Sequence, residues 1–273
     1  MSNILNVILK EELSIKKLSQ ILKLSERQVR YHIKKLNRKG IVNYSAFIDY
    51  SKFYPIEFLI MFSDFNSRKK IKKTLYNKFK GKLVDFGIFD PNFNFAIREM
   101  AFTVGACPCY IHGFALSHRD ILRFLDIMRN TSEFKILYSR KNEKGLKLDN
   151  IVRKIFFELI KDSNRSIRDI SRACKIKEHR MWYMLYKLRK EGVIKKKARI
   201  KLDMMEYAIL GKSKRVQDEW IREIIKFDET MFIKGYASSL HRIFHLADEL
   251  SSAEVIFITE KPVENFILED EYL

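Results

Sequence analysis

Two segments of this 273-residue chain repeat each other without a gap. The first runs from Ser14 to Asn43 and reads SIKKLSQILKLSERQVRYHIKKLNRKGIVN; the second runs from Ser166 to Lys195 and reads SIRDISRACKIKEHRMWYMLYKLRKEGVIK. Identical residues stand at Ser14/Ser166, Ile15/Ile167, Ser19/Ser171, Lys23/Lys175, Glu26/Glu178, Tyr31/Tyr183, Lys35/Lys187, Leu36/Leu188 and Gly40/Gly192. Self-similarity over such a length indicates two copies of one structural unit.

Each segment predicts two short helices joined by a tight turn and followed by a β-strand, the plan of a winged helix-turn-helix. In the first segment the apolar residues recur at helical spacing and give each helix one buried side, at Leu18, Ile21 and Leu22 and then at Val29, Ile33 and Leu36. Ser25 is placed to cap the second helix, and Gly40 is placed to end it.

The other side of this second helix is cationic and suits the major groove of DNA. Arg and Gln can hydrogen-bond base edges, whereas Lys and Tyr can reach phosphates. The residues predicted to lie at DNA are Ser25, Arg27, Gln28, Arg30, Tyr31, Lys34, Lys35 and Arg38. The alternative is a solvated basic face with no partner.

The matching surface of the second segment has a different composition, with His179, Arg180, Trp182, Tyr183, Tyr186 and Lys187. Its aromatic residues either contact DNA or pack on a neighbouring domain. The strand that follows is rich in cations, namely Lys195, Lys196, Lys197, Arg199 and Lys201. Phosphate contact is the favoured interpretation of that cluster, and an edge strand protected from aggregation is the alternative.

Composition favours a polyanionic partner. The net charge is +19 and the sequence pI is about 9.7, and such a charge repels itself unless a partner neutralises it. Double-stranded DNA is the expected partner. The first residues do not resemble a signal peptide, and the most apolar stretch is too short to span a bilayer. We therefore expect a cytoplasmic protein without a membrane partner.

Outside the two repeats the pattern predicts α/β domains in an α+β fold. The first half gives strands at 56–62, 82–89, 94–104, 110–115 and 134–139 with helices at 68–79 and 120–129, which is a ferredoxin-like β-α-β-β-α-β order if 94–104 is an insertion. The second half gives strands at 206–210, 230–237 and 254–259 with helices at 215–226 and 240–250. The predicted domains are 1–50 (winged helix-turn-helix), 51–145 (ferredoxin-like), 146–203 (winged helix-turn-helix) and 204–273 (shorter ferredoxin-like), an internal duplication. Whether the two α/β halves pair within one chain or between chains stays open.

The three cysteines do not form a disulfide framework. Cys174 replaces the buried Leu22 of the first repeat. Cys107 and Cys109 lie near His112 and could bind a metal or form a redox pair, with both sulfurs expected on the same side of a β-like run. Packing is the favoured interpretation, so the sequence predicts no metal and no cofactor.

The repeated unit resembles the Lrp/AsnC family of prokaryotic transcription regulators. The matching residues are Leu18-Ser19, Leu24-Ser25, Arg27, Val29, Ile33, Leu36 and Gly40 to Val42. The resemblance implies a helix-turn-helix joined to a ferredoxin-like domain that dimerises and senses a small molecule, so a small-molecule effector and a homodimer are expected. A tandem arrangement in one chain departs from the family, which usually carries one unit per chain.

These observations predict a DNA-binding transcription regulator that reads duplex DNA with both modules. The first alternative is an architectural DNA-binding protein of low specificity. The second is an enzyme, because siroheme decarboxylases also resemble Lrp/AsnC proteins; its candidate groups would be His112, His118, His241 and His245. Since no catalytic triad, phosphate-binding glycine loop or paired carboxylates support that alternative, the sequence predicts that the chain is not an enzyme and has no catalytic residues.

Overall fold

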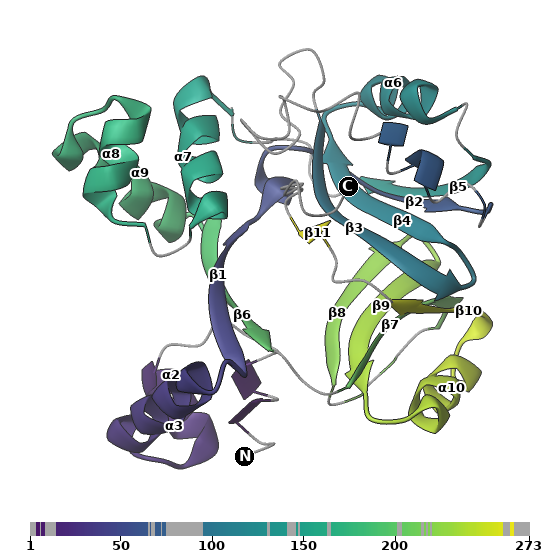
Figure 1. Ribbon diagram of the computed structural model, residues 1–273, viewed down its shortest axis with the longest axis horizontal. Coiled ribbons are helices and arrows are strands. Elements are labelled where there is room, and N and C mark those ends of the chain that lie inside the picture. Colours follow the sequence, from purple (N-terminus) through teal and green to yellow (C-terminus); the bar gives the residue numbers. More distant parts are fainter. Residues whose placement is uncertain are drawn as a thin grey trace.

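The chain forms two helical heads on one side and a large antiparallel sheet on the other (Figure 1). The structure is a computed structural model. It describes residues 4–5, 7–8, 15–64, 66, 69–71, 73–74, 95–129, 132–140, 146, 148–162, 165–200, 204–213, 216, 218, 220–258 and 263–264. Parts of the predicted helix 68–79 and the whole predicted strand 82–89 lie outside these residues.

Both repeats form the predicted helix-turn-helix. The first head contains α2 (Ile15–Leu22) and α3 (Glu26–Arg38), and the second contains α7 (Asn150–Lys161), α8 (Ile167–Cys174) and α9 (Glu178–Lys190). The turns between helices are alike, because Lys23 and Lys175 both take the left-handed conformation, with φ of 53° and 56°. After the second helix, Gly40 and Gly192 have φ of 68° and 69°, values at which a side chain is strained.

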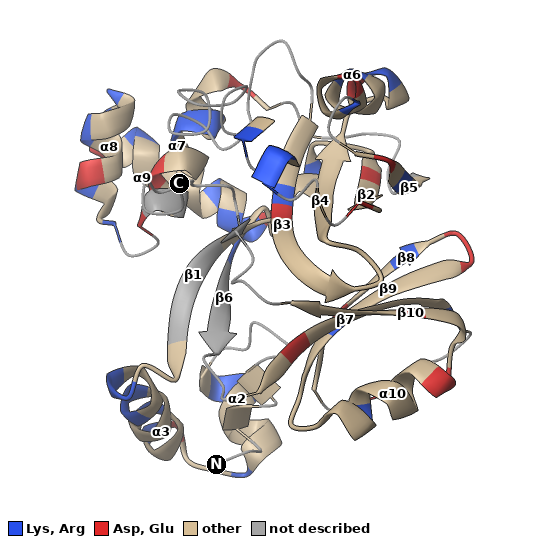
Figure 2. Cartoon of the chain, turned by 45° about the vertical axis from the view of Figure 1, so that its right-hand side comes forward, with Lys and Arg blue, Asp and Glu red and all other residues tan. Residues whose placement is uncertain are grey.

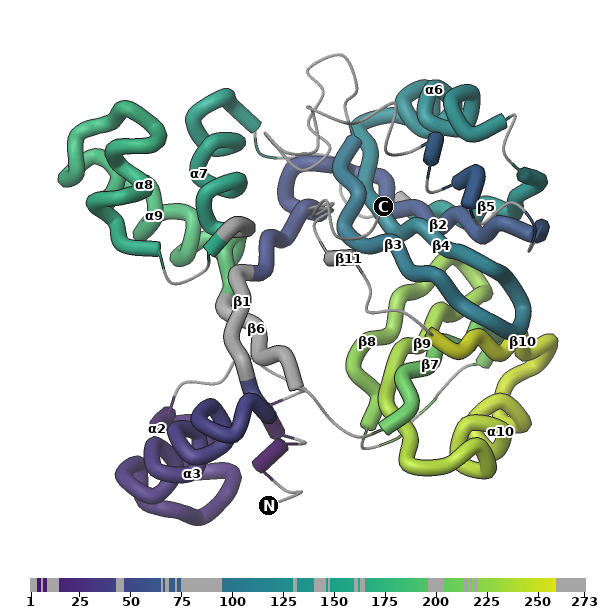
Figure 3. Tube along the Cα trace, viewed as in Figure 1, coloured from purple at the N-terminus to yellow at the C-terminus, as the bar shows by residue number. Residues whose placement is uncertain are grey.

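The strand that follows each head pairs with the strand of the other head. β1 (Val42–Ile48) and β6 (Ile194–Ile200) run antiparallel, with Val42 opposite Ile200 and Ile48 opposite Ile194. This two-stranded ribbon stands in place of two separate wings. Because the strands are antiparallel and each begins directly after its head, the heads lie at opposite ends of the ribbon (Figure 3).

The first α/β half has the strand order β5-β2-β4-β3, the order of a ferredoxin-like sheet. A short 3₁₀ helix, η1 (Tyr50–Lys52), precedes it. Its elements are β2 (Ile56–Phe62), β3 (Phe95–Gly105), β4 (Cys109–Ala115), α6 (His118–Met128) and β5 (Phe134–Arg140). The expectation that 94–104 is an insertion was wrong. That segment is β3, an integral strand that pairs with β4 along its length.

The second half repeats this order as β10-β7-β9-β8. Its elements are β7 (Met205–Lys212), β8 (Ile221–Phe227), β9 (Thr230–Ala237), α10 (Leu240–Asp248) and β10 (Ser251–Ile258), while the short β11 (Val263–Glu264) pairs with β3. The predicted helix 215–226 was wrong. Ile225 and Phe227 are buried and alternate with exposed residues, which is the period of a strand.

The two halves pair within the chain, which answers the question that the sequence left open. Ile256 of β10 lies opposite Gly105 of β3, so both halves join in one sheet. The end strands β5 and β8 also approach each other, so the sheet curls back on itself. Its inner faces enclose an apolar cluster that includes Leu59, Tyr110 and Phe232, whereas α6 and α10 cover the outer faces (Figure 1).

Each helical head packs on the α/β half of the other repeat. The core of the second head includes Tyr50, Phe53 and Phe114 from the first half. Trp220 and Tyr236 of the second half pack against the core of the first head. The heads are therefore held in place by crossed contacts as well as by the ribbon. Among the described helices, none is long and apolar enough to cross a bilayer.

Candidate functional site

The outward face of α3 is rich in cations. Val29 and Leu36 are buried on the core side, as the sequence predicts. All seven residues predicted for the outer face of the helix are exposed, namely Arg27, Gln28, Arg30, Tyr31, Lys34, Lys35 and Arg38. Figure 2 shows the ribbon of α3 in blue where Lys and Arg occur. The helix thus presents cations to any polyanion that approaches it.

Two of these residues also interact within the helix. The Ser25 backbone N–H donates to Gln28 Oε1 at 2.8 Å, and the Gln28 backbone N–H donates to Ser25 Oγ at 3.2 Å. This reciprocal capping box starts α3, and it uses the amide oxygen that the sequence interpretation assigned to base reading. Arg30 lies 3.4 Å from Glu26 Oε2, with both side chains largely exposed, a weak pair that a phosphate could displace.

The outward face of α9 is aromatic as well as basic. Trp182, Tyr183 and Tyr186 are 55%, 61% and 50% exposed. The rings of Trp182 and Tyr186 are parallel, with centroids 5.5 Å apart and an interplanar angle of 3°. His179, Arg180 and Lys187 are also exposed. These aromatic side chains therefore do not pack on a described neighbouring domain, one of the two alternatives that the sequence offered.

The cationic strand after the second head is β6, which the sequence placed in a wing. Lys195, Lys196, Lys197 and Arg199 lie opposite Phe47, Ala46, Ser45 and Asn43 of β1. Lys195 Nζ lies 3.6 Å from Asp49 Oδ2, so an acidic residue of the first half partly neutralises it. The side chains of Lys196, Lys197 and Arg199 are outside the described structure, and their contact with phosphates stays a prediction.

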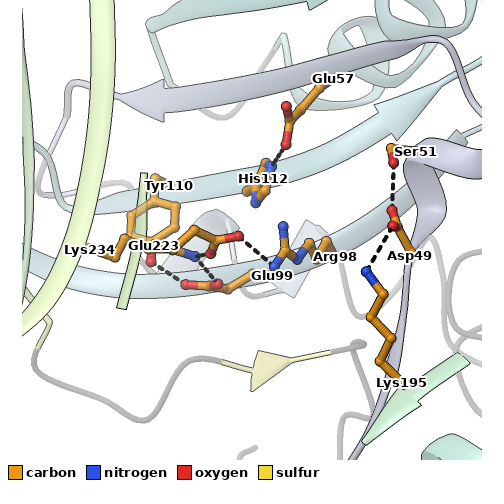
Figure 4. Close-up of polar contacts among 10 residues, drawn as sticks. All are labelled: Asp49, Ser51, Glu57, Arg98, Glu99, Tyr110, His112, Lys195, Glu223 and Lys234. Atoms are coloured by element: carbon orange, nitrogen blue, oxygen red, sulfur yellow. Dashed lines mark hydrogen bonds and ion pairs between the residues drawn. The ribbon is translucent and has the colours of Figure 1, made fainter. Parts of the chain in front are cut away.

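A cluster of buried charges lies where the two α/β halves meet (Figure 4). We call it the buried ionic cluster: Glu57 of β2, Arg98 and Glu99 of β3, Tyr110 and His112 of β4, Glu223 of β8 and Lys234 of β9. Lys234 Nζ lies 2.5 Å from Glu99 Oε2 and 2.9 Å from Glu223 Oε2. Arg98 lies 2.6 Å from Glu223 Oε1. These ion pairs tie β3 of the first half to β8 and β9 of the second.

The pKa values follow from burial and from these partners. Burial alone would raise the pKa of Glu99, but Lys234, Arg222 and hydrogen bonds from Lys234 and Tyr110 outweigh it and lower the pKa to about 2. Burial would lower the pKa of Lys234, but Glu223 and Glu99 raise it. The pKa of the Tyr110 hydroxyl is well above its usual value because of burial and the Glu99 charge. Glu99 is therefore a carboxylate and Lys234 an ammonium at neutral pH.

His112 forms a second buried acid–base pair in the same cluster. Its Nε2 lies 2.9 Å from Glu57 Oε1, and the two side chains are 0% and 4% exposed. Burial lowers the pKa of His112, although the hydrogen bond to Glu57 opposes that shift. The other ring nitrogen, Nδ1, has no hydrogen-bond partner among the residues that the structure describes. A neutral imidazole with one unused nitrogen is a group that can transfer a proton.

The four histidines considered for an enzyme do not come together. His112 lies in the buried ionic cluster, whereas His118 begins α6 and contacts the Tyr138 ring at a centroid distance of 4.7 Å. His241 and His245 are exposed on α10, on the outer face of the other half. The structure thus supports a role in the protein interior for His112 alone.

The sulfurs of Cys107 and Cys109 do not face the same side. Cys107 lies in the apolar cluster between the two halves, and its Sγ is 3.7 Å from Thr103 Oγ1. Cys109, the first residue of β4, packs in the cluster under α6. The expectation of parallel sulfurs was wrong because Cys107 precedes the strand. No group of His, Cys, Asp or Glu that could hold a metal ion occurs among the described residues.

Apart from His112, sequence reasoning missed the buried ionic cluster. The signal was present in the strands IEFLIMF, AIREMAF and MFIKGYA, where Glu57, Arg98-Glu99 and Lys234 interrupt otherwise apolar runs. A lone charge is costly to bury unless an opposite charge pairs with it. Such interruptions therefore predict buried pairs, although sequence alone does not tell which charges meet.

Two family models match the helical heads. The model described as "Bacterial regulatory protein, arsR family" matches residues 1–44, and "Winged helix-turn-helix DNA-binding" matches residues 148–195. No curated protein is similar enough in sequence to match. The chain therefore contains helix-turn-helix domains of a kind used by DNA-binding regulators.

Among solved structures, the siroheme decarboxylase NirDL matches with a TM-score of 0.50 and 13% identity, over 98% of this chain and 94% of that chain. NirDL in complex with an iron-uroporphyrin III analogue matches with a TM-score of 0.49 and 14% identity, over 94% and 90%. LrpC of B. subtilis matches with a TM-score of 0.31 and 21% identity, over 42% of this chain and 97% of its own.

These likenesses correct one expectation. The prediction that the chain is not an enzyme is contradicted, because a structure that shares its fold over nearly the whole chain is an enzyme. At 13% identity the likeness concerns the fold. The overall fold of this chain is therefore similar to that of a siroheme decarboxylase.

Proposed function

We propose that this protein is a DNA-binding regulator that holds duplex DNA with its two helical heads. One observation carries the proposal: each end of the β1–β6 ribbon bears a helix-turn-helix whose second helix exposes a basic face. The net charge of +19 agrees with a polyanionic partner. The family-model matches to both heads also support it.

The ribbon sets the distance between the two heads. Seven residues per strand, at about 3.3 Å each, separate its ends by roughly 23 Å. Each recognition helix lies beyond its own end of the ribbon, so a spacing of one DNA turn, roughly 34 Å, is within reach. A single chain would then cover two half-sites. The matched turns at Lys23 and Lys175 and at Gly40 and Gly192 support the finer proposal that the two halves are copies of one Lrp/AsnC-like unit.

The test replaces Arg27 and Arg30 by Ala in the full chain and measures binding to a selected duplex and to a scrambled one. Each arginine that pairs with a base edge contributes roughly 1–3 kcal/mol of discrimination, so the double variant should lose most of its preference. Arg119→Ala is the matched control, because this exposed arginine lies on α6, away from both heads. Unchanged preference in the double variant would contradict base reading by α3.

An enzymatic role is a second candidate, supported by the buried ionic cluster. A surface that only binds DNA does not need a buried His112–Glu57 pair or a buried Glu99–Lys234–Glu223 triad, and such polar groups are costly inside a protein. The fold is also that of a siroheme decarboxylase. Decarboxylation breaks a carbon–carbon bond, releases CO₂ and adds a proton to the remaining carbon, so it needs a group that passes on a proton taken from water, and the neutral His112 could do so through Nδ1.

This candidate is tested by incubating the protein with siroheme and following the mass of the tetrapyrrole. Loss of 44 Da per carboxylate, roughly the mass of CO₂, is expected from the wild type and not from His112→Ala, while the exposed His245→Ala serves as control. An unchanged mass spectrum with the wild-type protein would contradict this activity. DNA binding is measured on the same samples, so the two candidate functions are judged separately.

A further inference from the structure

Helix α9 exposes a stacked aromatic pair on the surface where a recognition helix meets its partner. Trp182 and Tyr186 are one helical turn apart, and their rings are parallel within 3°. Half or more of each residue is exposed, and Tyr183 beside them is 61% exposed. Three large aromatic side chains on the outer face of one short helix leave an apolar patch in water, and such a patch indicates a binding surface.

The matching positions of the first head carry different chemistry. The gapless repeat aligns Trp182 with Arg30 and Tyr186 with Lys34, while Tyr183 aligns with Tyr31. Arginine and lysine reach base edges and phosphates, which a duplex presents on its outside. Indole and phenol rings present flat π-faces, which fit the faces of bases. Duplex DNA hides those faces in its stack, so the aromatic rings of the second helix suit bases that are unpaired.

The positive charge of the second head also favours a nucleic acid as the partner. The second head carries exposed cations on α8, on the turn that follows it and on α9 itself, at Arg168, Arg172, Lys175, Lys177, Arg180, Lys187, Arg189 and Lys190. Exposed acids lie at both ends of α9, with Glu178 as its first residue and Glu191 directly after it, and Lys187 Nζ lies 4.0 Å from Glu191 Oε1. The excess of positive charge favours a polyanion, and aromatic rings among cations favour one that also carries bases.

We propose that α9 binds single-stranded nucleic acid, with unpaired bases stacked on Trp182, Tyr183 and Tyr186 and the phosphates held by the surrounding cations. This rests on the proposed DNA-binding function and adds a second kind of partner to it. On a duplex site the cations of α9 contact phosphates, as proposed above. Where the nucleic acid is unpaired, the rings of α9 stack on its bases while α3 still holds duplex. A chain built in this way recognises a junction between paired and unpaired nucleic acid.

The experiment uses the full chain and oligothymidylate, which forms no duplex with itself. Trp182 and Trp220 are the two tryptophans, and Trp220 is half-buried against the core of the first head. Bases that stack on Trp182 should quench its fluorescence, and the quenching should be absent in Trp182→Phe. Binding of labelled oligothymidylate, followed by anisotropy, should weaken roughly tenfold to a hundredfold in Trp182→Ala/Tyr186→Ala, in keeping with the loss of base stacking. Trp182→Phe keeps a flat ring and should retain most of the affinity, which separates stacking from any loss of fold.

Three controls decide the outcome. Arg27→Ala/Arg30→Ala should bind oligothymidylate within about twofold of wild type while losing duplex preference. Polyglutamate tests for a surface that recognises charge alone, and binding equal to that of the oligonucleotide would overturn the proposal. Unchanged oligonucleotide affinity in the double aromatic variant would also overturn the proposal. Equal quenching of Trp182 by a duplex of the same length would overturn it as well. If the wild-type chain selects no duplex but still binds the oligonucleotide, the proposed function of α3 is overturned and this inference stands.

Discussion

At the scale of single residues, the buried ionic cluster most strongly constrains how the two halves meet. Lys234 is 1% exposed and pairs with two carboxylates, Glu99 and Glu223. Removing one partner of a buried pair leaves the other charge without compensation. The cluster therefore favours this contact between the halves, because separating β3 from β8 and β9 would break these ion pairs.

We predict that Lys234→Met lowers the free energy of unfolding by about 3–5 kcal/mol, because Glu99 stays buried without the ammonium group that neutralises it. Urea unfolding followed by circular dichroism measures the change. Lys212→Met is the matched control: Lys212 pairs with Glu229 at 3.0 Å, but both side chains are more than half exposed, so a change of about 0–1 kcal/mol is expected. Equal effects of the two variants would show that the buried pair contributes no more than a surface one.

A second prediction for a single residue concerns the loss of stability at low pH. The pKa of Glu99 is about 2 in the folded protein, below its value of roughly 4.3 in an unfolded chain. As pH falls through that interval the unfolded state takes up the proton first, so stability that is present above about pH 4.3 is lost toward pH 2. Glu99→Gln should be less stable at neutral pH and should show a shallower loss across this interval. An equally steep loss in the variant would assign the acid sensitivity to other carboxylates.

At the scale of elements, the two recognition helices begin differently. Ser25 caps α3 through the hydrogen bonds of the capping box, whereas Lys177 at the matching position of α9 makes no side-chain cap. Both positions have extended backbone, with ψ of 152° and 141°, so either could hold a capping serine.

We predict changes of opposite sign at these two positions. Ser25→Ala should destabilise the first head by about 1 kcal/mol, and Lys177→Ser should stabilise the second by a similar amount, roughly 0.5–1 kcal/mol. Thermal unfolding of the full chain, with amide hydrogen exchange to separate the two heads, measures both. A stabilising effect of Ser25→Ala, or protection that changes only in the opposite head, would contradict the capping geometry.

Helical elements were predictable from sequence because their signals are local. The stripe of Val29 and Leu36, the cap at Ser25 and the turn at Gly40 all act within one or two turns. The segment 215–226 was misassigned because Ile225 and the following Phe227 belong to a strand buried against the other half, and this contact is distant in the sequence. The pairing of β1 with β6 brings together residues from the two halves, and no local pattern encodes that register.

At the scale of the whole molecule, the chain resembles two interlocked copies of one unit. The ribbon, the β3–β10 junction and the crossed packing of the heads all join the first half to the second. Sequence similarity between the halves made two heads predictable. It did not predict that each head rests on the other half's sheet, because that depends on which of several apolar surfaces meet. The same interlocking brings the buried ionic cluster together and sets the distance between the heads.

The central claim is that both heads bind one duplex, and its most direct test is selection of binding sites from a random duplex pool near physiological salt. The account predicts a motif bound at least ~10³-fold more tightly than a scrambled duplex, in two parts whose centres lie roughly 10 base pairs apart. Inserting five base pairs between the parts should abolish most of that preference, because it moves one half-site to the opposite face of the duplex. No enriched motif, or a motif unaffected by the insertion, would contradict the claim that the ribbon holds two heads for one DNA site.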